Sequence, residues 1–242
     1  MRIKINLTSQ PSTSIPIDYN YNLYLCLRRK VLNYVDTHKP KLFNRYKKAF
    51  PEFTFSQLMI PDRKIELGYI EITGKYLSFF LSSVDVTFME YLVKAVNFAG
   101  EFVIHEKTFA LKKVEVMEDP EFSSGMKFRM LSPLLLIKTD GKKVNFIRPD
   151  DGDLGEVFSA RLVEKYNTLY RAAYSAKDIH FRLDQDYLER KKNLTRLLTI
   201  RNVNYRTIFA PFYLEGEVDL IKFAYNNGIG DKTHYGLGMF EV

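Results

Sequence analysis

The chain has 242 residues, of which 46% are hydrophobic and 27% charged, with a formal net charge of +7. This composition is typical of a folded globular protein and excludes collagen-like, coiled-coil and disordered classes. The single cysteine, Cys26, cannot form an internal disulfide or a cysteine-based zinc site, so we expect a reducing, cytoplasmic compartment. No apolar run approaches the roughly 18 residues that a membrane span requires, so we expect no membrane association.

In the first half of the chain, the spacing of apolar residues alternates between the strand and the helix period. Leu23, Leu27 and Val31 recur at helical spacing, and Asp85 precedes a second apolar helical pattern that it is suited to cap. The predicted elements, in chain order, are a strand at 1–7, a helix at 22–35, strands at 53–60, 65–72 and 76–82, a helix at 86–99 and a strand at 109–117.

The turn-rich segment 119–125 predicts a domain boundary, with one domain at 1–121 and a second at 122–242. The second half is predicted to hold strands at 127–137 and 143–147, a helix at 153–176, strands at 179–183, 194–201 and 205–214, a helix at 217–227 and a strand at 238–242. The order β-α-β-β-α-β thus occurs approximately twice, with additional strands. We therefore predict an α+β fold of two tandem ferredoxin-like domains, the architecture also used by RNA-recognition modules.

Positive charge is concentrated in two stretches. Residues 28–48 contain eight Lys or Arg against one acidic residue, Asp36, and residues 182–206 contain seven against three. Such concentration favours a groove for a polyanion, because Lys and Arg that neutralise phosphates release condensed counterions. The alternative from charge alone is a solvated basic face.

Familiar catalytic and cofactor motifs are absent. The segment Gly228-Ile229-Gly230-Asp231-Lys232-Thr233 has neither the spacing nor the strand-to-helix setting of a nucleotide-binding loop. No two of the four histidines lie three or four residues apart, as a metal site on one helix face would require. We therefore expect no metal and no cofactor.

The end of the chain carries the most specific signature. Gly228-Ile229-Gly230, a short polar insert and Gly236-Leu237-Gly238 resemble the glycine-rich loop of CRISPR-associated repeat-processing endoribonucleases, the Cas-six family. Three weaker similarities follow the family's order: Ile-Pro-Ile-Asp-Tyr-Asn at 15–20, Phe-Thr-Phe-Ser-Gln-Leu at 53–58 and Leu-Ser-Pro at 131–133. Together these segments span nearly the whole chain.

The resemblance implies two tandem ferredoxin-like domains that bind CRISPR repeat RNA. It also implies metal-independent cleavage of precursor CRISPR RNA within its repeats, by attack of a 2′-hydroxyl, to give guide RNAs. Implied partners are the repeat RNA and other CRISPR effector subunits, with the protein itself a monomer or homodimer. A non-catalytic repeat-RNA-binding homologue is the leading alternative, and a backbone subunit of an effector complex is a third.

Members of the family place a catalytic His, supported by Tyr and Lys, between the first helix and the Phe-Thr-Phe-Ser strand. Here the alignment puts Tyr46 or Lys47 at that position, while His38 comes several residues earlier. We therefore take His38, Lys30, Tyr46 and Lys47 as catalytic candidates, His38 for proton transfer and the lysines for the phosphorane charge. The alternatives are an exposed helix-end role for His38 and core packing for Tyr46. The histidines at 105 and 180 fall in strand patterns and are expected to be structural.

Candidates for RNA contact are six further basic residues of the two charged stretches and residues of the glycine loop. Glycine permits positive φ and close backbone approach, so loop amides and Lys232 are suited to meet phosphates. The alternative for these glycines is a helix cap followed by a tight turn. The candidates are Arg28, Arg29, Arg45, Lys191, Lys192, Arg196, Gly228, Gly230, Lys232, His234, Gly236 and Gly238.

Overall fold

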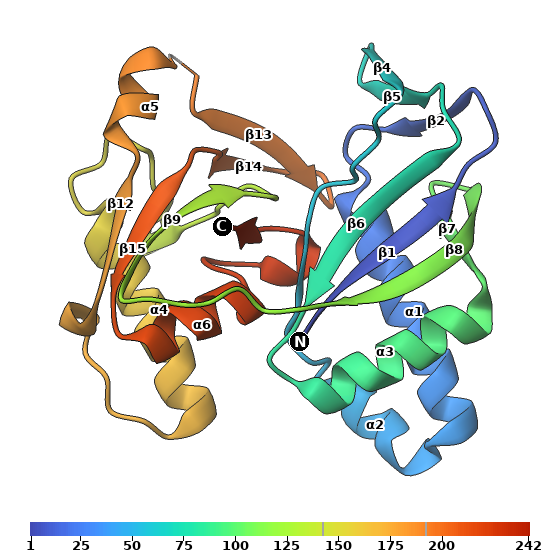
Figure 1. Cartoon of the computed structure of the whole chain (residues 1–242), viewed down its shortest axis with the longest axis horizontal. Coiled ribbons are helices and arrows are strands. Elements are labelled where there is room, and N and C mark those ends of the chain that lie inside the picture. Colours follow the sequence, from blue (N-terminus) through green and yellow to red (C-terminus); the bar gives the residue numbers. More distant parts are fainter. Residues whose placement is uncertain (142, 192) are drawn as a thin grey trace. The chain divides into compact units, whose positions relative to one another are not determined.

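The computed structural model describes residues 1–141, 143–191 and 193–242. The chain forms two compact units, Met1–Glu118 and Asp119–Val242 (Figure 1). The boundary lies at the start of the turn-rich segment 119–125. No helix among the described residues is long and apolar enough to cross a membrane.

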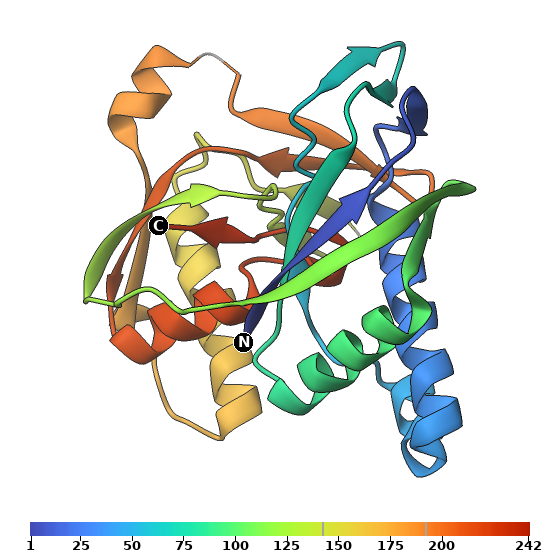
Figure 2. The same ribbon diagram turned by 45° about the vertical axis from the view of Figure 1, so that its right-hand side comes forward.

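The first unit is built on a five-stranded antiparallel sheet with the order β3-β6-β1-β8-β7. Its strands are β1 (Arg2–Thr8), β3 (Thr54–Phe55), β6 (Tyr76–Ser82), β7 (Glu101–Ile104) and β8 (Lys107–Met117), and its helices are α1 (Asn20–His38), α2 (Pro40–Lys48) and α3 (Val86–Ala99). Here β1, β3, β6 and β8 take the places of the first, second, third and fourth strands of the β-α-β-β-α-β order. The fourth strand, β8, borders the first, β1, and the third strand, β6, lies between β1 and β3. This arrangement confirms a ferredoxin-like unit, and Figure 2 shows its helices gathered on one side of the sheet.

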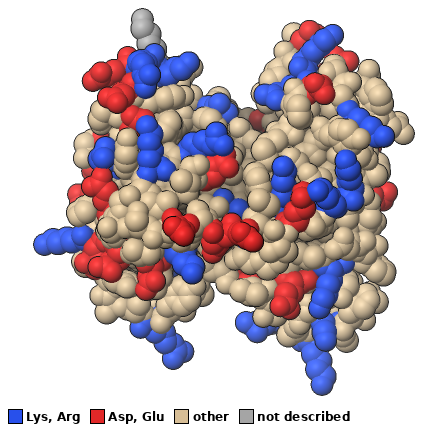
Figure 3. Space-filling view, viewed as in Figure 1, with Lys and Arg blue, Asp and Glu red and all other residues tan. Residues whose placement is uncertain are grey.

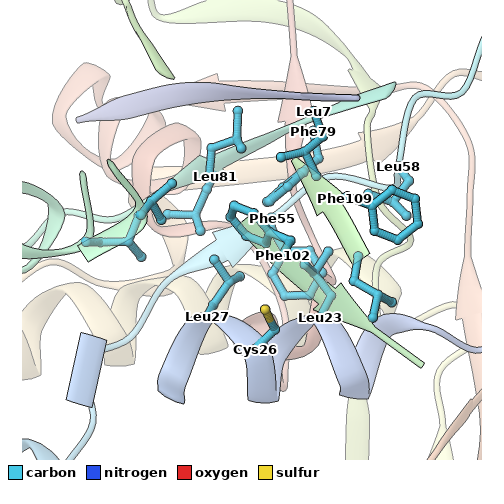
Figure 4. Packing of buried hydrophobic residues seen from close by; sticks show 14 of the residues in the cluster. Leu7, Leu23, Cys26, Leu27, Phe55, Leu58, Phe79, Leu81, Phe102 and Phe109 are labelled. Atoms are coloured by element: carbon cyan, nitrogen blue, oxygen red, sulfur yellow. The ribbon is translucent and has the colours of Figure 1, made fainter. Parts of the chain in front are cut away.

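The core of this unit follows directly from the sequence periods. In β1 alternate residues Ile3, Ile5 and Leu7 are fully buried, as the period of two in a strand requires. They pack with the apolar stripe of α1 that includes Leu23 and Leu27 (Figure 4). The predicted cap of α3 is confirmed, because the Phe88 amide donates to Asp85 Oδ1 at 2.8 Å.

A second, three-stranded sheet of the first unit joins β2 (Thr13–Pro16), β5 (Tyr69–Ile72) and β4 (Arg63–Glu66). The single strand predicted at 65–72 is wrong, since Leu67 and Gly68 have φ of 47° and 80° and turn the chain into the β4–β5 hairpin. Of the strand predicted at 53–60, Thr54 and Phe55 form β3, and Met59 pairs with Ser78 of β6 through a separate bridge.

The second unit has a four-stranded sheet in the order β12-β15-β9-β16, which is the same ferredoxin-like order. Its strands are β9 (Gly125–Met130), β12 (Ile179–Leu183), β15 (Phe212–Gly216) and β16 (Phe240–Glu241), and its helices are α4 (Leu154–Tyr170), α5 (Gln185–Arg190) and α6 (Val218–Asn227). Two hairpins, β10 (Ile137–Asp140) with β11 (Lys143–Phe146) and β13 (Thr195–Ile200) with β14 (Val203–Ile208), are inserted between these elements.

Three predicted boundaries in the second unit need correction. The helix predicted to reach 176 ends at Tyr170, where Arg171 adopts φ 54°. The strand predicted at 127–137 ends at Met130, and the one predicted at 205–214 divides into β14 and β15. Pro211 lies at that division, where its missing N–H prevents a continuous ladder. The short helix α5 was not predicted.

Candidate nucleic-acid interface

Three of the predicted basic residues, Arg28, Arg29 and Lys47, line one groove on the first unit. The groove has a volume of about 550 Å³ and crosses the side of α1 that faces α2 and the turn between β7 and β8. Its complete lining is Asn22, Leu25, Cys26, Arg28, Arg29, Leu32, Asn33, Phe43, Lys47, Val103, His105 and Glu106. With three cations and one carboxylate, its electrostatics favour an anionic ligand.

Hydrogen-bond and aromatic contacts hold two of the three basic side chains of this groove, Arg28 and Lys47. Arg28 Nη2 donates to the Lys47 carbonyl at 3.3 Å, and the Arg28 guanidinium lies 5.6 Å from the centroid of Phe50. Lys47 Nζ lies 5.9 Å from the centroid of Phe43. These contacts hold the charged groups of Arg28 and Lys47 near aromatic rings.

Basic side chains are therefore gathered by the helix pair, and Figure 3 shows several of them projecting from the end of the first unit where Figure 1 labels α2. Arg45 is exposed on α2, and its carbonyl accepts from the Ala49 amide at 2.9 Å. Among the residues that the structure describes, no group of three or more His, Cys, Asp or Glu side chains is placed to hold a metal ion.

Lys30 lies against β7. Its Nζ is 4.9 Å from the centroid of Phe102, and burial lowers its pKa, an effect opposed by the charges of Cys26 and Glu101. The neighbouring Cys26 thiol has its pKa raised by burial. Cys26 is thus buried, whereas Lys30 is half-buried beside it.

His38 is the last residue of α1, whereas the groove residue Asn22 lies near the start of this helix. Its ring stacks on Tyr34 with a centroid distance of 4.2 Å and meets Phe98 of α3 edge-on at 5.5 Å. Its Nδ1 lies 3.0 Å from the Tyr34 carbonyl. His38 is nine residues, and about 13 Å along the helix, beyond Arg29, and it does not line the groove.

Tyr46 packs in the core of the first unit. Its side chain is 5% exposed, and its ring meets Phe50, Phe88 and Tyr91 edge-on at 6.3, 6.4 and 6.3 Å. Burial raises the pKa of its hydroxyl. Of the two alternatives for Tyr46, this environment favours packing over stacking on a base.

The glycine loop of the second unit joins α6 to β16. Gly230 and Gly238 have φ of 79° and 69°, and both come very close to backbone of their own unit. A Cβ on Gly238 would lie 1.8 Å from the Ile229 carbonyl oxygen, and one on Gly230 would lie 2.3 Å from the Leu135 carbonyl oxygen. The glycines at these two positions are therefore required by internal packing.

The loop is packed on the segment 131–137, which begins with Leu-Ser-Pro. The Gly238 amide donates to the Pro133 carbonyl at 2.7 Å, and the Met239 amide donates to Ser132 Oγ at 2.9 Å. The Ile137 amide donates to Asp231 Oδ2 at 2.8 Å. The two family-like segments in the second half of the sequence, the glycine loop and Leu-Ser-Pro, are thus packed against each other.

The polar insert of the loop carries Lys232 and His234. Lys232 adopts φ 55°, and its Nζ lies 5.6 Å from the centroid of Tyr205 in β14. The His234 ring lies 4.1 Å from that of Tyr235. Gly228 and Gly236, with φ of 75° and 73°, end α6 and the short 3-10 turn Thr233–Tyr235.

The remaining predicted contacts lie near β13. The Arg196 guanidinium lies 3.7 Å from the centroid of Phe209, and Lys191 follows the end of α5, exposed, with its amide donating to the Tyr187 carbonyl. Lys192 lies outside the described residues.

His105 was expected to be structural within a strand, but it lies in the turn between β7 and β8. It has φ 46°, followed by Glu106 at 65°, and it lines the groove beside Arg28, Arg29 and Lys47. Its Nε2 lies 2.7 Å from Asn22 Nδ2 of α1. The sequence did contain a signal for this turn. Two short runs that contain apolar residues flank the pair His-Glu, and this spacing is typical of a β-hairpin with a two-residue loop.

The fold and the site together define a class of protein: two tandem ferredoxin-like units, a basic helix pair in the first, and a glycine-rich loop closing the second. The C-terminal profile described as CRISPR associated protein Cas6 matches residues 117–242, and the corresponding N-terminal profile matches residues 15–115. The chain belongs to the Cas6 (Cas-six) family.

Relatives match along nearly their whole length. A CRISPR-associated endoribonuclease-like Cas6 protein of Pyrococcus furiosus is 27% identical, covering 100% of this chain and 98% of the relative. The CRISPR-associated endoribonuclease Cas6 1 of Methanocaldococcus jannaschii is 28% identical, covering 99% and 91%. The solved structure of a Cas6-related protein from Pyrococcus furiosus, 24% identical, superposes with a TM-score of 0.83 over 100% of this chain and 97% of its own.

Proposed function

We propose that this protein binds CRISPR repeat RNA and cleaves precursor CRISPR RNA within its repeats without a metal ion, releasing guide RNAs. The observation that carries the proposal is the match of both halves of the chain to the Cas6 family, whose M. jannaschii member is named an endoribonuclease. The reaction is attack of a ribose 2′-oxygen on the adjacent phosphorus. It yields a 2′,3′-cyclic phosphate and a 5′-hydroxyl.

Chemical features of the first unit support this proposal. Metal-free cleavage requires cations around the phosphorane, a base for the 2′-hydroxyl proton and an acid for the departing 5′-oxygen. Arg28, Arg29 and Lys47 supply fixed positive charge in one groove. Lys232 and the aromatic ring beneath it supply a second basic contact, in the glycine loop.

A repeat-RNA-binding homologue that does not cleave is the second candidate function. The observation that favours it is the setting of His38, whose ring stacks on Tyr34 of α1 and meets Phe98 of α3 edge-on and does not line the groove. The alignment also places Tyr46 or Lys47 where the family has its catalytic His, and Tyr46 is buried.

The deciding experiment incubates the protein with end-labelled repeat RNA in EDTA and scores binding and cleavage on the same samples. We expect cleavage at one position, and no cleavage of an otherwise identical RNA with 2′-deoxyribose at that position, with binding unchanged. Binding of the all-ribose RNA without cleavage would establish the non-cleaving homologue instead. Absence of both would overturn the proposal.

We also place the protein in the cytoplasm, alone or as a homodimer, with access to other CRISPR effector subunits. The buried free thiol of Cys26 agrees with a reducing compartment. Comigration of the RNA-bound protein with effector subunits would test that association.

A further inference from the structure

The groove of the first unit is lined by one histidine, His105, and not by His38. His105 is carried by the tight turn between β7 and β8, and the distance of 2.7 Å between its Nε2 and Asn22 Nδ2 links this turn to α1 across 83 residues of sequence. The α1 helix and the β7 strand lie side by side in Figures 1 and 2. The ring is therefore anchored at the groove.

The contact with Asn22 also assigns the proton on the ring. An amide Nδ2 only donates, so Nε2 of His105 accepts and the neutral ring carries its hydrogen on Nδ1. Nε2 is then the basic nitrogen of the imidazole. Its lone pair is occupied in the free protein by one neutral hydrogen bond, and a ribose hydroxyl can replace that bond with another of similar strength.

The surroundings of this ring match a phosphate subsite. Arg28, Arg29 and Lys47 share the groove with His105, and its volume of about 550 Å³ suits a nucleotide-sized group. The backbone at His105 and Glu106 is in the left-handed region, with φ of 46° and 65°. Positive φ at both central residues is the geometry of a tight two-residue hairpin turn, and Arg201 and Asn202 share it in the β13–β14 turn.

We propose that His105 is the general base of RNA cleavage, with Asn22 as its positioning residue and the cations of the groove holding the scissile phosphate. This inference rests on the proposed function. In the step, Nε2 of His105 takes the 2′-hydroxyl proton, the 2′-oxygen forms a bond to phosphorus, and the bond from phosphorus to the 5′-oxygen breaks. The departing 5′-oxygen takes a proton from solvent water, and the imidazolium later returns its proton to solvent.

The test compares single-turnover cleavage of labelled repeat RNA by the wild-type protein, His105→Gln and His38→Ala, in EDTA. Gln retains the size and an acceptor for Asn22 but cannot take the proton. We expect His105→Gln to bind RNA normally and to cleave at least about a hundredfold more slowly. We expect His38→Ala to stay within about threefold of wild type.

Two further measurements separate proton transfer from a structural role. The wild-type rate is expected to fall at acidic pH, because a protonated imidazole cannot accept the 2′-hydroxyl proton, and His105→Gln is expected to lose this limb. Added imidazole is expected to restore part of the cleavage by His105→Ala. For each variant, thermal unfolding checks that the fold is intact.

The outcomes distinguish this inference from the proposed function. Cleavage by His105→Gln at the wild-type rate, or a slow variant that keeps the acid limb, overturns the role of His105 and leaves the endoribonuclease assignment standing. Binding without cleavage by the wild-type protein overturns both. A threefold or smaller loss in His105→Gln with a large loss in His38→Ala assigns the proton transfer to His38 and overturns the inference.

Discussion

The two units share one topology and differ in the connection from the second helix to the last ferredoxin-like strand. In the first unit this connection is β7 with its turn into β8, and in the second it is the glycine loop between α6 and β16. Each connection carries one histidine, His105 or His234, and each contacts the first helix of its own unit. Asn22 of α1 meets His105, whereas Lys165 of α4 donates to the Gly230 carbonyl at 3.0 Å.

The two connections differ in how closely they pack against the rest of their unit. The glycine loop is tied to the segment 131–137 by backbone hydrogen bonds and lies close against it. The β7–β8 turn meets α1 at one side chain and leaves a groove of about 550 Å³ beside it. One connection is therefore suited to a rigid binding surface, and the other can admit a group between itself and the helix.

The largest expected effect concerns α2, which has no counterpart in the second unit. Tyr46→Ala should destabilise the first unit by about 3–5 kcal/mol, because it removes a buried ring from an aromatic cluster. Tyr46→Phe keeps the ring, so we expect nearly normal stability and cleavage. Chemical denaturation with a parallel cleavage assay checks both. Loss of cleavage by a stable Tyr46→Phe protein would return Tyr46 to the catalytic residues.

The glycines of the two connections provide a matched pair. Gly238 and Gly100 have φ of 69° and 67°, but a Cβ would lie 1.8 Å from a carbonyl oxygen at Gly238 and meets nothing within 4 Å at Gly100. We expect Gly238→Ala to cost roughly 3 kcal/mol or more through strain and overpacking, and Gly100→Ala only about 1 kcal/mol through strain. Equal losses in urea denaturation would contradict the close packing of the loop.

The basic side chains of the two units can be compared by the salt dependence of RNA binding. Lys232→Ala should weaken binding and reduce the slope of log affinity against log salt by about one, since one phosphate contact is lost. Arg29→Ala in the groove should have a similar effect. Lys177→Ala, an exposed residue before β12, is the control. An unchanged slope in Lys232→Ala would remove this residue from the phosphate contacts.

The smallest effect concerns acid stability. Lys127 lowers the pKa of Asp184 through an ion pair of 2.6 Å, and Lys113 lowers the pKa of Glu115 in the first unit. A carboxylate with a lowered pKa stabilises the fold above its unfolded value, about 4, and that contribution is lost as pH falls through the folded value.

Asp184→Asn should therefore reduce the difference in unfolding free energy between pH 6 and pH 3, and Glu115→Gln should reduce it less. The side chain of Asp184 is 5% exposed and that of Glu115 is 38% exposed, so solvent screens the second pair more. Asn retains the ability to cap α5 at position 184. Equal pH dependence in wild type and Asp184→Asn, measured by urea unfolding, would show that the ion pair is not maintained in solution.

The amino-acid sequence by itself determined the order of the main ferredoxin-like elements, their duplication and the family, but not the additional elements β2, α2, β7 and α5. Periods of two and of about 3.6 residues report which face of a strand or helix is buried, and they predicted β1, β6, β12 and α3 closely. They did not predict the β4–β5 turn or the division of β14 from β15. At both places the apolar pattern continues along the sequence, although the strand ends and the chain changes direction.

Only the tertiary structure decided which candidates of the site lie together. Arg28, Arg29 and Lys47 meet because α2 folds back on α1, and His38 points to α3 because of its place on the last turn of α1. Asn22 and His105 are 83 residues apart, and they are brought together by the place of β7 at the sheet edge. Local patterns record burial and backbone preference, whereas such long-range contacts depend on strand order, which no single segment encodes.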